Sequence, residues 1–312
     1  MRNLNLLFYK EYYQKLGTRD FQRDVVNNNK ALLNARFDYK RDYAAPVLAD
    51  CQSFVLMLAY PGLLIGTGYP HGVGKLEKLI YKTKDSDDEK NSEDISLGFF
   101  FDYVTGQPVI PGSSVKGVLR SHFKYHSEAV TEILKGMDMA AVSTDTVKEL
   151  EKAIFDNSDV FFDAVICKGD AEGRMLGFDY ITPHSSVAKN PVPIRIIKVL
   201  PEVQLEFRFK ISDKKEIDGV TFTAEKLKEL FKELILLFGA GAKTNVGYGV
   251  FVEQDAAQPK NAEALGSSKN AGKETHRETN RKTNTKKKKK TQKQPSFDDA
   301  LPEWKKKLQS WK

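Results

Sequence analysis

Cysteine and histidine are scarce in this sequence. Its 312 residues contain two cysteines and five histidines, and Cys51 and Cys167 lie far apart without CxxC spacing. The chain therefore offers neither a disulfide framework nor a cysteine-based zinc site. Because no His/Cys metal spacing and no GxSxG nucleophile elbow occurs either, we expect neither a metal nor a cofactor.

Long apolar runs are also absent. No stretch of about 18 consecutive apolar residues occurs, which argues against a transmembrane helix. The start, Met1–Asn5, lacks the apolar run and small-residue cleavage site of a signal peptide, so we expect a cytoplasmic protein without a membrane partner. Hydrophobic residues nevertheless make up 40% of the chain, which is enough to bury a sizeable core.

Positive charge is concentrated at one end of the chain. The chain has 49 Lys and Arg residues, of which sixteen follow Asp255, and 42 Asp and Glu residues, of which six follow Asp255. Residues 256–312 therefore carry a net charge of +10, and residues 1–255 carry −3. Residues 256–312 have few large apolar side chains to offset chain entropy, which predicts a basic, mostly disordered tail. Its lysine run at 286–290 is typical of a solubilising or non-specific polyanion-binding segment. The basic pI therefore says nothing about the rest of the chain.

Apolar periodicity divides residues 1–255 into strands and helices. We predict one helix over 113–126, capped by Ser113 or Ser114, and another over 224–238, where Thr223 caps the start and Gly239 ends the helix. The predicted strands are 54–60, a hairpin of 97–103 with 109–110, 160–166, 194–200, 203–211 and 249–252.

The order of these segments predicts the fold class. With 194–200 and 203–211 as the middle strands, the chain reads strand, helix, strand, strand, helix, strand, which is the ferredoxin-like order. We therefore predict an α+β, ferredoxin-like (RRM-like) domain over residues 1–255, with an antiparallel sheet packed by helices. Insertions are expected at about 61–110 and 127–193, and the strand at 160–166 falls in the second of them.

The segment Ile110–Arg120 is the first candidate binding site. A small-residue turn feeding a helix N-terminus presents backbone N–H groups and the positive end of the helix dipole, which together suit a phosphate. Gly117 costs a helix about 1 kcal/mol relative to Ala, which suggests a close approach to the backbone there. A capped helix with a solvated cationic face is the alternative interpretation. Gly112, Ser113 and Ser114 form this turn, and Lys116, Arg120 and Lys124 follow as a basic stripe along the helix.

The segment Gly239–Gly249 is the second candidate. Its glycines would let the backbone approach a sugar-phosphate chain, and Tyr248 could stack on a base. It is not a Walker loop, because Ala242 precedes Lys243 and the helix comes before the loop. A simple RRM is also excluded, since the aromatic strand follows the second helix. The polar residues of this loop are Lys243, Thr244, Asn245 and Tyr248, and the backbone-approach glycines are Gly117, Gly239, Gly241, Gly247 and Gly249.

Both segments, in this order, resemble the RAMP superfamily of CRISPR proteins, whose ferredoxin-like domains carry a glycine-rich loop between the second helix and the last strand. Three further segments look like the sixth Cmr subunit of type III-B effector complexes in particular: Asn3–Phe8, Leu176–His184 and Asn190–Ile194. The lysine-rich tail is not part of the family pattern.

The resemblance implies a function in antiviral defence. A protein of this kind would be a non-catalytic, RNA-binding structural subunit that caps the filament near the 3′ end of the guide RNA and contacts the guide–target duplex. Its partners would be guide CRISPR RNA, target RNA and the backbone, small and capping Cmr subunits. By this resemblance, the residues that position RNA phosphates would be Gly112, Ser113, Ser114, Lys116 and Arg120, and the residues that contact RNA or a neighbouring subunit would be Lys243, Thr244, Asn245 and Tyr248. Its two glycine-lined turns would lie close together and form a cradle for a ribose-phosphate strand.

Two other functions remain open. A RAMP endoribonuclease that processes CRISPR transcripts would need a general acid or base, and His71 in a loop after the first strand is the candidate, although a loop histidine more often hydrogen-bonds backbone or RNA. His122 and His126 lie on a predicted helix, and His184 follows a turn. Asp102 and Asp179 are interpreted as carboxylates that bind backbone N–H groups. A scaffold that binds polyanions through its tail alone is the third possibility.

Overall fold

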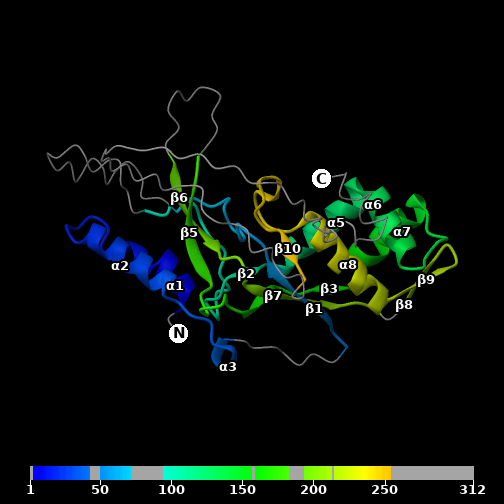
Figure 1. The fold of residues 1–312 in the computed structure, drawn as a ribbon, viewed down its shortest axis with the longest axis horizontal. Helices are drawn as coiled ribbons and strands as arrows, with labels where there is room; N and C mark the ends of the chain where they lie inside the picture. The colour runs from blue at the N-terminus through cyan, green and yellow to red at the C-terminus, as the bar shows by residue number, and fades with distance from the viewer. Residues whose placement is uncertain are drawn as a thin grey trace, which may run out of the picture.

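The computed structural model describes residues 3–42, 50–71, 94–156, 159–182, 193–212 and 214–253. The predicted tail at 256–312 and His184 lie outside these residues. A six-stranded antiparallel sheet runs through the described part (Figure 1). Its strands are β1 (Gln52–Leu58), β2 (Val109–Ile110), β3 (Val160–Phe161), β4 (Ala164–Lys168), β7 (Gln204–Lys210) and β10 (Phe251–Val252).

The strand order identifies the fold. The sheet runs β10-β1-β7-β4-β2, and β3 also pairs with β7. Along the chain, the order is β1, α5 (Gly112–Tyr125), β4, β7, α8 (Ala224–Phe238) and β10. The last strand, β10, lies beside the first, β1, and the third strand, β7, lies between β1 and the second strand, β4; all these neighbours are antiparallel. This is the ferredoxin-like arrangement, so the predicted fold class is confirmed.

One middle strand of the sheet differs from the prediction. The segment paired with β7 is β4, which was expected to lie inside an insertion. The predicted middle strand at 194–200 is β6 (Ile194–Val199), and it pairs with β5 (Leu176–Ile181) in a separate two-stranded sheet. Both segments have the apolar pattern of a strand, and the pattern does not specify the partner. Six consecutive cross-strand pairs with β5 outweigh adjacency to β7 along the chain.

The predicted hairpin of 97–103 with 109–110 is only partly formed. Phe101 forms an isolated bridge to Pro108, whereas β2 pairs with β4. The reason lies in Tyr9, whose hydroxyl accepts from the Phe99 N–H at 3.0 Å and donates to the Phe99 carbonyl. A side chain therefore takes the backbone groups that a strand partner would need.

The helices α5 and α8 begin in different ways. Thr223 caps α8 by accepting from the Lys226 N–H at 3.2 Å, and Gly239 ends the helix with φ 76°, as predicted. The expected serine cap of α5 is wrong, because Pro111 is the N-cap residue and makes no side-chain cap bond. The carboxylate of Asp163 accepts from the Gly112 N–H instead, at 2.7 Å.

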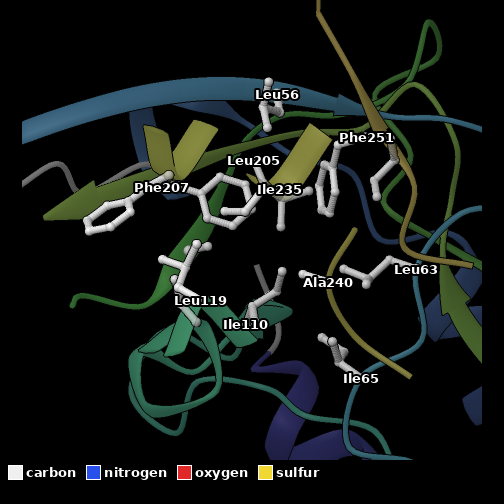
Figure 2. Packing of buried hydrophobic residues seen from close by; sticks show 14 of the residues in the cluster. Leu56, Leu63, Ile65, Ile110, Leu119, Leu205, Phe207, Ile235, Ala240 and Phe251 are labelled. Atoms are coloured by element: carbon white, nitrogen blue, oxygen red, sulfur yellow. The ribbon is translucent and has the colours of Figure 1, made fainter. Parts of the chain in front are cut away.

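The core lies between the sheet and its helices. Figure 2 shows Leu205 and Phe207 of β7 converging with Leu119 of α5 and Ile235 of α8, and all four are at most 1% exposed. The other described elements are α1 (Leu4–Tyr9), η1 (Glu11–Tyr13), α2 (Phe21–Leu33), α3 (Tyr39–Asp42), α6 (Ser127–Gly136), α7 (Thr144–Phe155), β8 (Lys214–Ile217), β9 (Val220–Thr223) and η3 (Thr244–Val246). In Figure 1, α5 to α8 gather toward one end of the sheet, and α1 and α2 lie beside the β5–β6 hairpin at the other.

Candidate RNA-binding surface

The glycine-rich loop between α8 and β10 is closed by backbone hydrogen bonds. The Ala240 N–H donates to the Gly249 carbonyl at 3.0 Å, which joins the two ends of the loop. The loop is also tied to the segment after β1, because the Gly249 N–H donates to Gly62 at 2.8 Å and the Ala242 N–H donates to Leu64 at 2.8 Å. The base of the loop is therefore fixed before any ligand arrives.

Most of the loop glycines serve this closure. A Cβ on Gly239 would overlap the Gly249 carbonyl, and one on Gly249 would overlap the Ala240 carbonyl. A Cβ on Gly241 would lie 2.5 Å from Leu63 Cδ1. At these three glycines, the chain's own atoms, including the Leu64 carbonyl 2.7 Å from the Cβ position of Gly241, occupy the space that a side chain would need. Gly247 is required for a different reason, its φ of 97°.

The loop tip presents polar side chains to solvent. Lys243 has the left-handed backbone conformation, with φ 59°, and begins the single turn of η3. Lys243, Thr244 and Asn245 are all exposed. These three predicted RNA-contacting residues are therefore placed where a phosphate or a ribose can reach them.

Tyr248 does not belong to this exposed tip. It is 7% exposed, and its hydroxyl donates to Asp179 Oδ2 at 2.9 Å. The Lys198 ammonium binds the same oxygen at 2.6 Å. Burial alone would raise the pKa of Asp179, but the bonds from Lys198 and Tyr248 outweigh it and hold this pKa below its usual value. Tyr248 fastens the loop to the β5–β6 hairpin, so the expectation that it stacks on a base is wrong in this conformation.

The first turn of α5 is also partly closed. The amide of Gly112 is bonded to Asp163, and a Cβ on Gly112 would overlap the Phe161 carbonyl. Ser113, Ser114 and Gly117 are exposed. Among the described residues, no atom would come within 4 Å of a Cβ on Gly117, so packing within the described chain does not require this glycine.

The basic stripe predicted along α5 is interrupted. Arg120 forms ion pairs with Glu151 of α7 and with Asp156, the latter at 2.8 Å. Lys116 Nζ lies 5.8 Å from the ring centroid of Phe161. Lys124 is exposed. Arg120 is therefore engaged by the protein itself, which contradicts its predicted contact with RNA.

Aromatic stacking brings α5 next to the loop. The rings of His122 and His126 stack on Phe238, with centroids 4.3 and 4.7 Å apart, and Gly239 begins the loop directly afterwards. The first turn of α5 instead contacts Phe161 and Asp163. The stacking thus joins the C-terminal half of α5 to the end of α8, outside both predicted segments, and the expected cradle between the two glycine-lined turns stays a prediction.

The family comparison agrees with this architecture. The RAMP superfamily profile matches residues 56–252, from β1 to the end of β10. The chain belongs to the RAMP superfamily. A search of curated proteins gave no match.

Several solved structures are similar to this RAMP protein. One is the cryo-EM structure of the type III-B Cmr-beta complex bound to cognate target RNA, with 21% identity and a TM-score of 0.39, covering 64% of this chain and 57% of that one. Another is the crystal structure of Cmr6 from Pyrococcus furiosus, with 21% identity and a TM-score of 0.36, covering 66% of this chain and 99% of that one. The chain thus spans little more than half the length of the first of these relatives.

His71 lies inside the RAMP protein. It is 3% exposed, and its ring stacks on Phe8 at a centroid distance of 3.6 Å. Its ring nitrogens lie 3.1 Å from the Ile95 carbonyl and 2.8 Å from the Phe8 carbonyl. Burial lowers the pKa of His71, although the two hydrogen bonds oppose this shift. His71 anchors α1, and neither the predicted RNA contact nor proton transfer to a 2′-OH is compatible with this position.

The residues that the structure describes also bear on metal binding and on membrane insertion. No cluster of three or more His, Cys, Asp or Glu side chains there has an arrangement that could hold a metal ion. Within the same residues, every helix is too short or too polar to cross a bilayer.

Proposed function

We propose that this RAMP protein is an RNA-binding structural subunit of a type III-B CRISPR effector complex, and that it performs no catalysis. It caps the filament near the 3′ end of the guide RNA, contacts the guide–target duplex and packs against other Cmr subunits. Membership of the RAMP superfamily supports the proposal that the protein belongs to an RNA-guided CRISPR complex. The segments Asn3–Phe8 and Leu176–His184 support the sixth Cmr position, because they resemble that subunit.

The observation that carries this proposal is the form of the glycine-rich loop. Lys243, Thr244 and Asn245 are exposed on a tip whose base is fixed to the rest of the domain by three backbone hydrogen bonds. Such a tip loses little conformational entropy when it binds, so a phosphate contact made there keeps most of its energy. Contacts of this kind carry no sequence preference, which suits a protein whose specificity comes from guide pairing.

We propose a smaller set of contact residues than the sequence suggested. The proposed contacts are Lys243, Thr244 and Asn245 in the loop, with Ser113 and Ser114 at the start of α5, which are exposed. Tyr248, Arg120 and His71 are omitted because the protein itself binds or buries their side chains. Gly112 is omitted because its N–H already donates to Asp163, and Lys116 because its ammonium lies over the Phe161 ring.

Purification of the tagged protein from its native host tests the proposal. We expect guide RNA and the other Cmr subunits to co-purify, and Lys243→Ala to lower the RNA yield by weakening a phosphate contact. Lys30→Ala is the matched control, since Lys30 is exposed on α2 and should leave the yield unchanged. Recovery of the protein without RNA and without Cmr partners would contradict the assignment.

The endoribonuclease alternative has its own test. Incubation of the purified protein with repeat RNA in the absence of metal should leave the RNA intact, because the candidate general acid or base is buried. Discrete cleavage products that depend on the protein would overturn the non-catalytic part of the proposal.

A further inference from the structure

An exposed tyrosine lies beside the loop and is not part of the predicted site. Tyr60 lies two residues after Leu58, the last residue of β1, and it is 80% exposed. Its backbone belongs to a turn in which the Gly62 N–H donates to the Ala59 carbonyl at 2.9 Å. The Ala59 N–H donates in turn to Val250 at 2.9 Å. The aromatic ring therefore projects into solvent from a fixed backbone.

The turn that carries Tyr60 is in direct contact with the glycine-rich loop. The Gly249 N–H donates to the Gly62 carbonyl at 2.8 Å, and a Cβ on Gly247 would lie 3.5 Å from Pro61 Cδ. The loop tip next to Gly247 includes the exposed Lys243. A single strand of RNA that binds Lys243 would thus pass close to the turn at 59–62.

A fixed cation lies over the Tyr60 ring. Lys198 Nζ is 5.8 Å from the ring centroid, and Lys198 is only 8% exposed. Asp179 holds the ammonium at 2.6 Å and also accepts from the Tyr248 hydroxyl. The cation is therefore held by a partly buried network, and its attraction to the ring favours one orientation of Tyr60.

We propose that Tyr60 is the stacking platform for an unpaired nucleobase of the bound RNA, the role expected of Tyr248 from the sequence. The inference rests on the proposed RNA-binding function and adds a specific contact to it. Single-stranded segments offer bases that stack on aromatic side chains, whatever the base. Tyr60 supplies an exposed ring on a rigid turn, and Lys243 contacts a phosphate of the same strand.

Fluorescence anisotropy of the full-length protein with a labelled single-stranded RNA tests this role over a series of salt concentrations. We expect Tyr60→Ala to weaken binding by roughly five- to 150-fold at every salt concentration, which is the range for loss of one stacked base. Tyr60→Phe should bind like the wild type because it keeps the ring. Tyr103→Ala is the matched control, since Tyr103 is 82% exposed.

The salt dependence separates stacking from charge. Loss of a phosphate contact lowers the slope of log K against log salt by about 0.7 for a single strand, so Lys243→Ala should flatten the slope and Tyr60→Ala should leave it unchanged. Binding through the lysine run at 286–290 weakens as salt rises, and the effect of Tyr60→Ala should persist at the highest salt that still permits binding.

The outcomes distinguish this inference from the function on which it rests. If the wild type binds RNA and Tyr60→Ala binds equally well, the stacking role is refuted and the RNA-binding function stands. If Tyr60→Ala loses Cmr subunits on purification but keeps its RNA affinity, Tyr60 is a protein contact and the inference is likewise refuted. If the wild type neither binds RNA in solution nor co-purifies with it, both proposals fail.

Discussion

Acidification should destabilise this protein through one buried histidine. His122 on α5 is 8% exposed, and among the described residues neither of its ring nitrogens has a hydrogen-bond partner. Burial first, and the neighbouring His126 second, lower the pKa of His122 from 6.5 to about 4. The folded protein therefore keeps this ring neutral at pH values where the unfolded chain protonates it.

The sign and size of the effect follow from linkage. Between pH 6.5 and about 4 the unfolded state binds more protons at this site than the folded state, so the free energy of unfolding falls as the pH falls. Each pKa unit corresponds to about 1.4 kcal/mol, which gives a total loss of about 3 kcal/mol, of which about 2 kcal/mol is reached at pH 5. Below about pH 4 no further loss comes from this group.

Urea unfolding of the wild type and of His122→Phe at pH 8, 6 and 5 measures this contribution. Phenylalanine keeps an aromatic ring against Phe238 and cannot take up a proton. Between pH 8 and pH 5, the free energy of unfolding should therefore fall by about 2 kcal/mol less in the variant than in the wild type. His126→Gln should make the loss of stability on acidification slightly smaller than in the wild type, because it removes the smaller of the two causes that lower the pKa of His122. Parallel stability curves for the wild type and His122→Phe would refute this account of His122.

Two further predictions concern the base of the glycine-rich loop. Tyr248→Phe should lower the free energy of unfolding by about 1.5–3 kcal/mol at pH 7, because it removes a hydrogen bond to the charged Asp179. Urea unfolding measures this difference in stability, which should become smaller well below pH 3.8, where the Asp179 carboxylate becomes protonated. Gly249→Ala should destabilise the protein more than Gly219→Ala: both glycines have φ near 70°, but a Cβ on Gly249 would overlap the Ala240 carbonyl, whereas no described atom lies within 4 Å of one on Gly219. Gly219→Ala should cost about 1–2 kcal/mol from backbone strain alone, and equal thermal shifts for the two variants would contradict this assignment of Gly249.

The fold was predictable where one segment carries its own signal. The helix α8 has a threonine cap, a three-four apolar spacing and a terminal glycine, and all three are local. The partner of β7 was not predictable in this way, because β4 and β6 have similar patterns and pairing depends on distant residues. The helices α6 and α7 were missed within a predicted insertion, although the capping box of Ser143 with Thr146 marks the start of α7.

In the candidate site, too, some features follow from the local sequence and others depend on residues far away along the chain. Exposure of Lys243, Thr244 and Asn245 follows from the polar tip of a glycine-rich loop, which the sequence displays directly. The burial of Tyr248 depends on Asp179, 69 residues away along the chain. The pairing of Arg120 depends on Glu151, 31 residues away. Long-range partners of this kind decide which side chains remain available, and a motif alone does not contain them.

The carboxylate bound at the start of α5 has a consequence for the path of a nucleic acid. Helix N-termini generally attract anions, but here Asp163 already supplies a negative group to the Gly112 amide. A polyanion that approaches this helix end meets a group of its own sign. Asp163 therefore offsets part of the positive end of the α5 dipole, so an RNA strand at this turn would bind through the exposed hydroxyls of Ser113 and Ser114, and the stronger attraction for its phosphates would come from the exposed Lys243 of the glycine-rich loop.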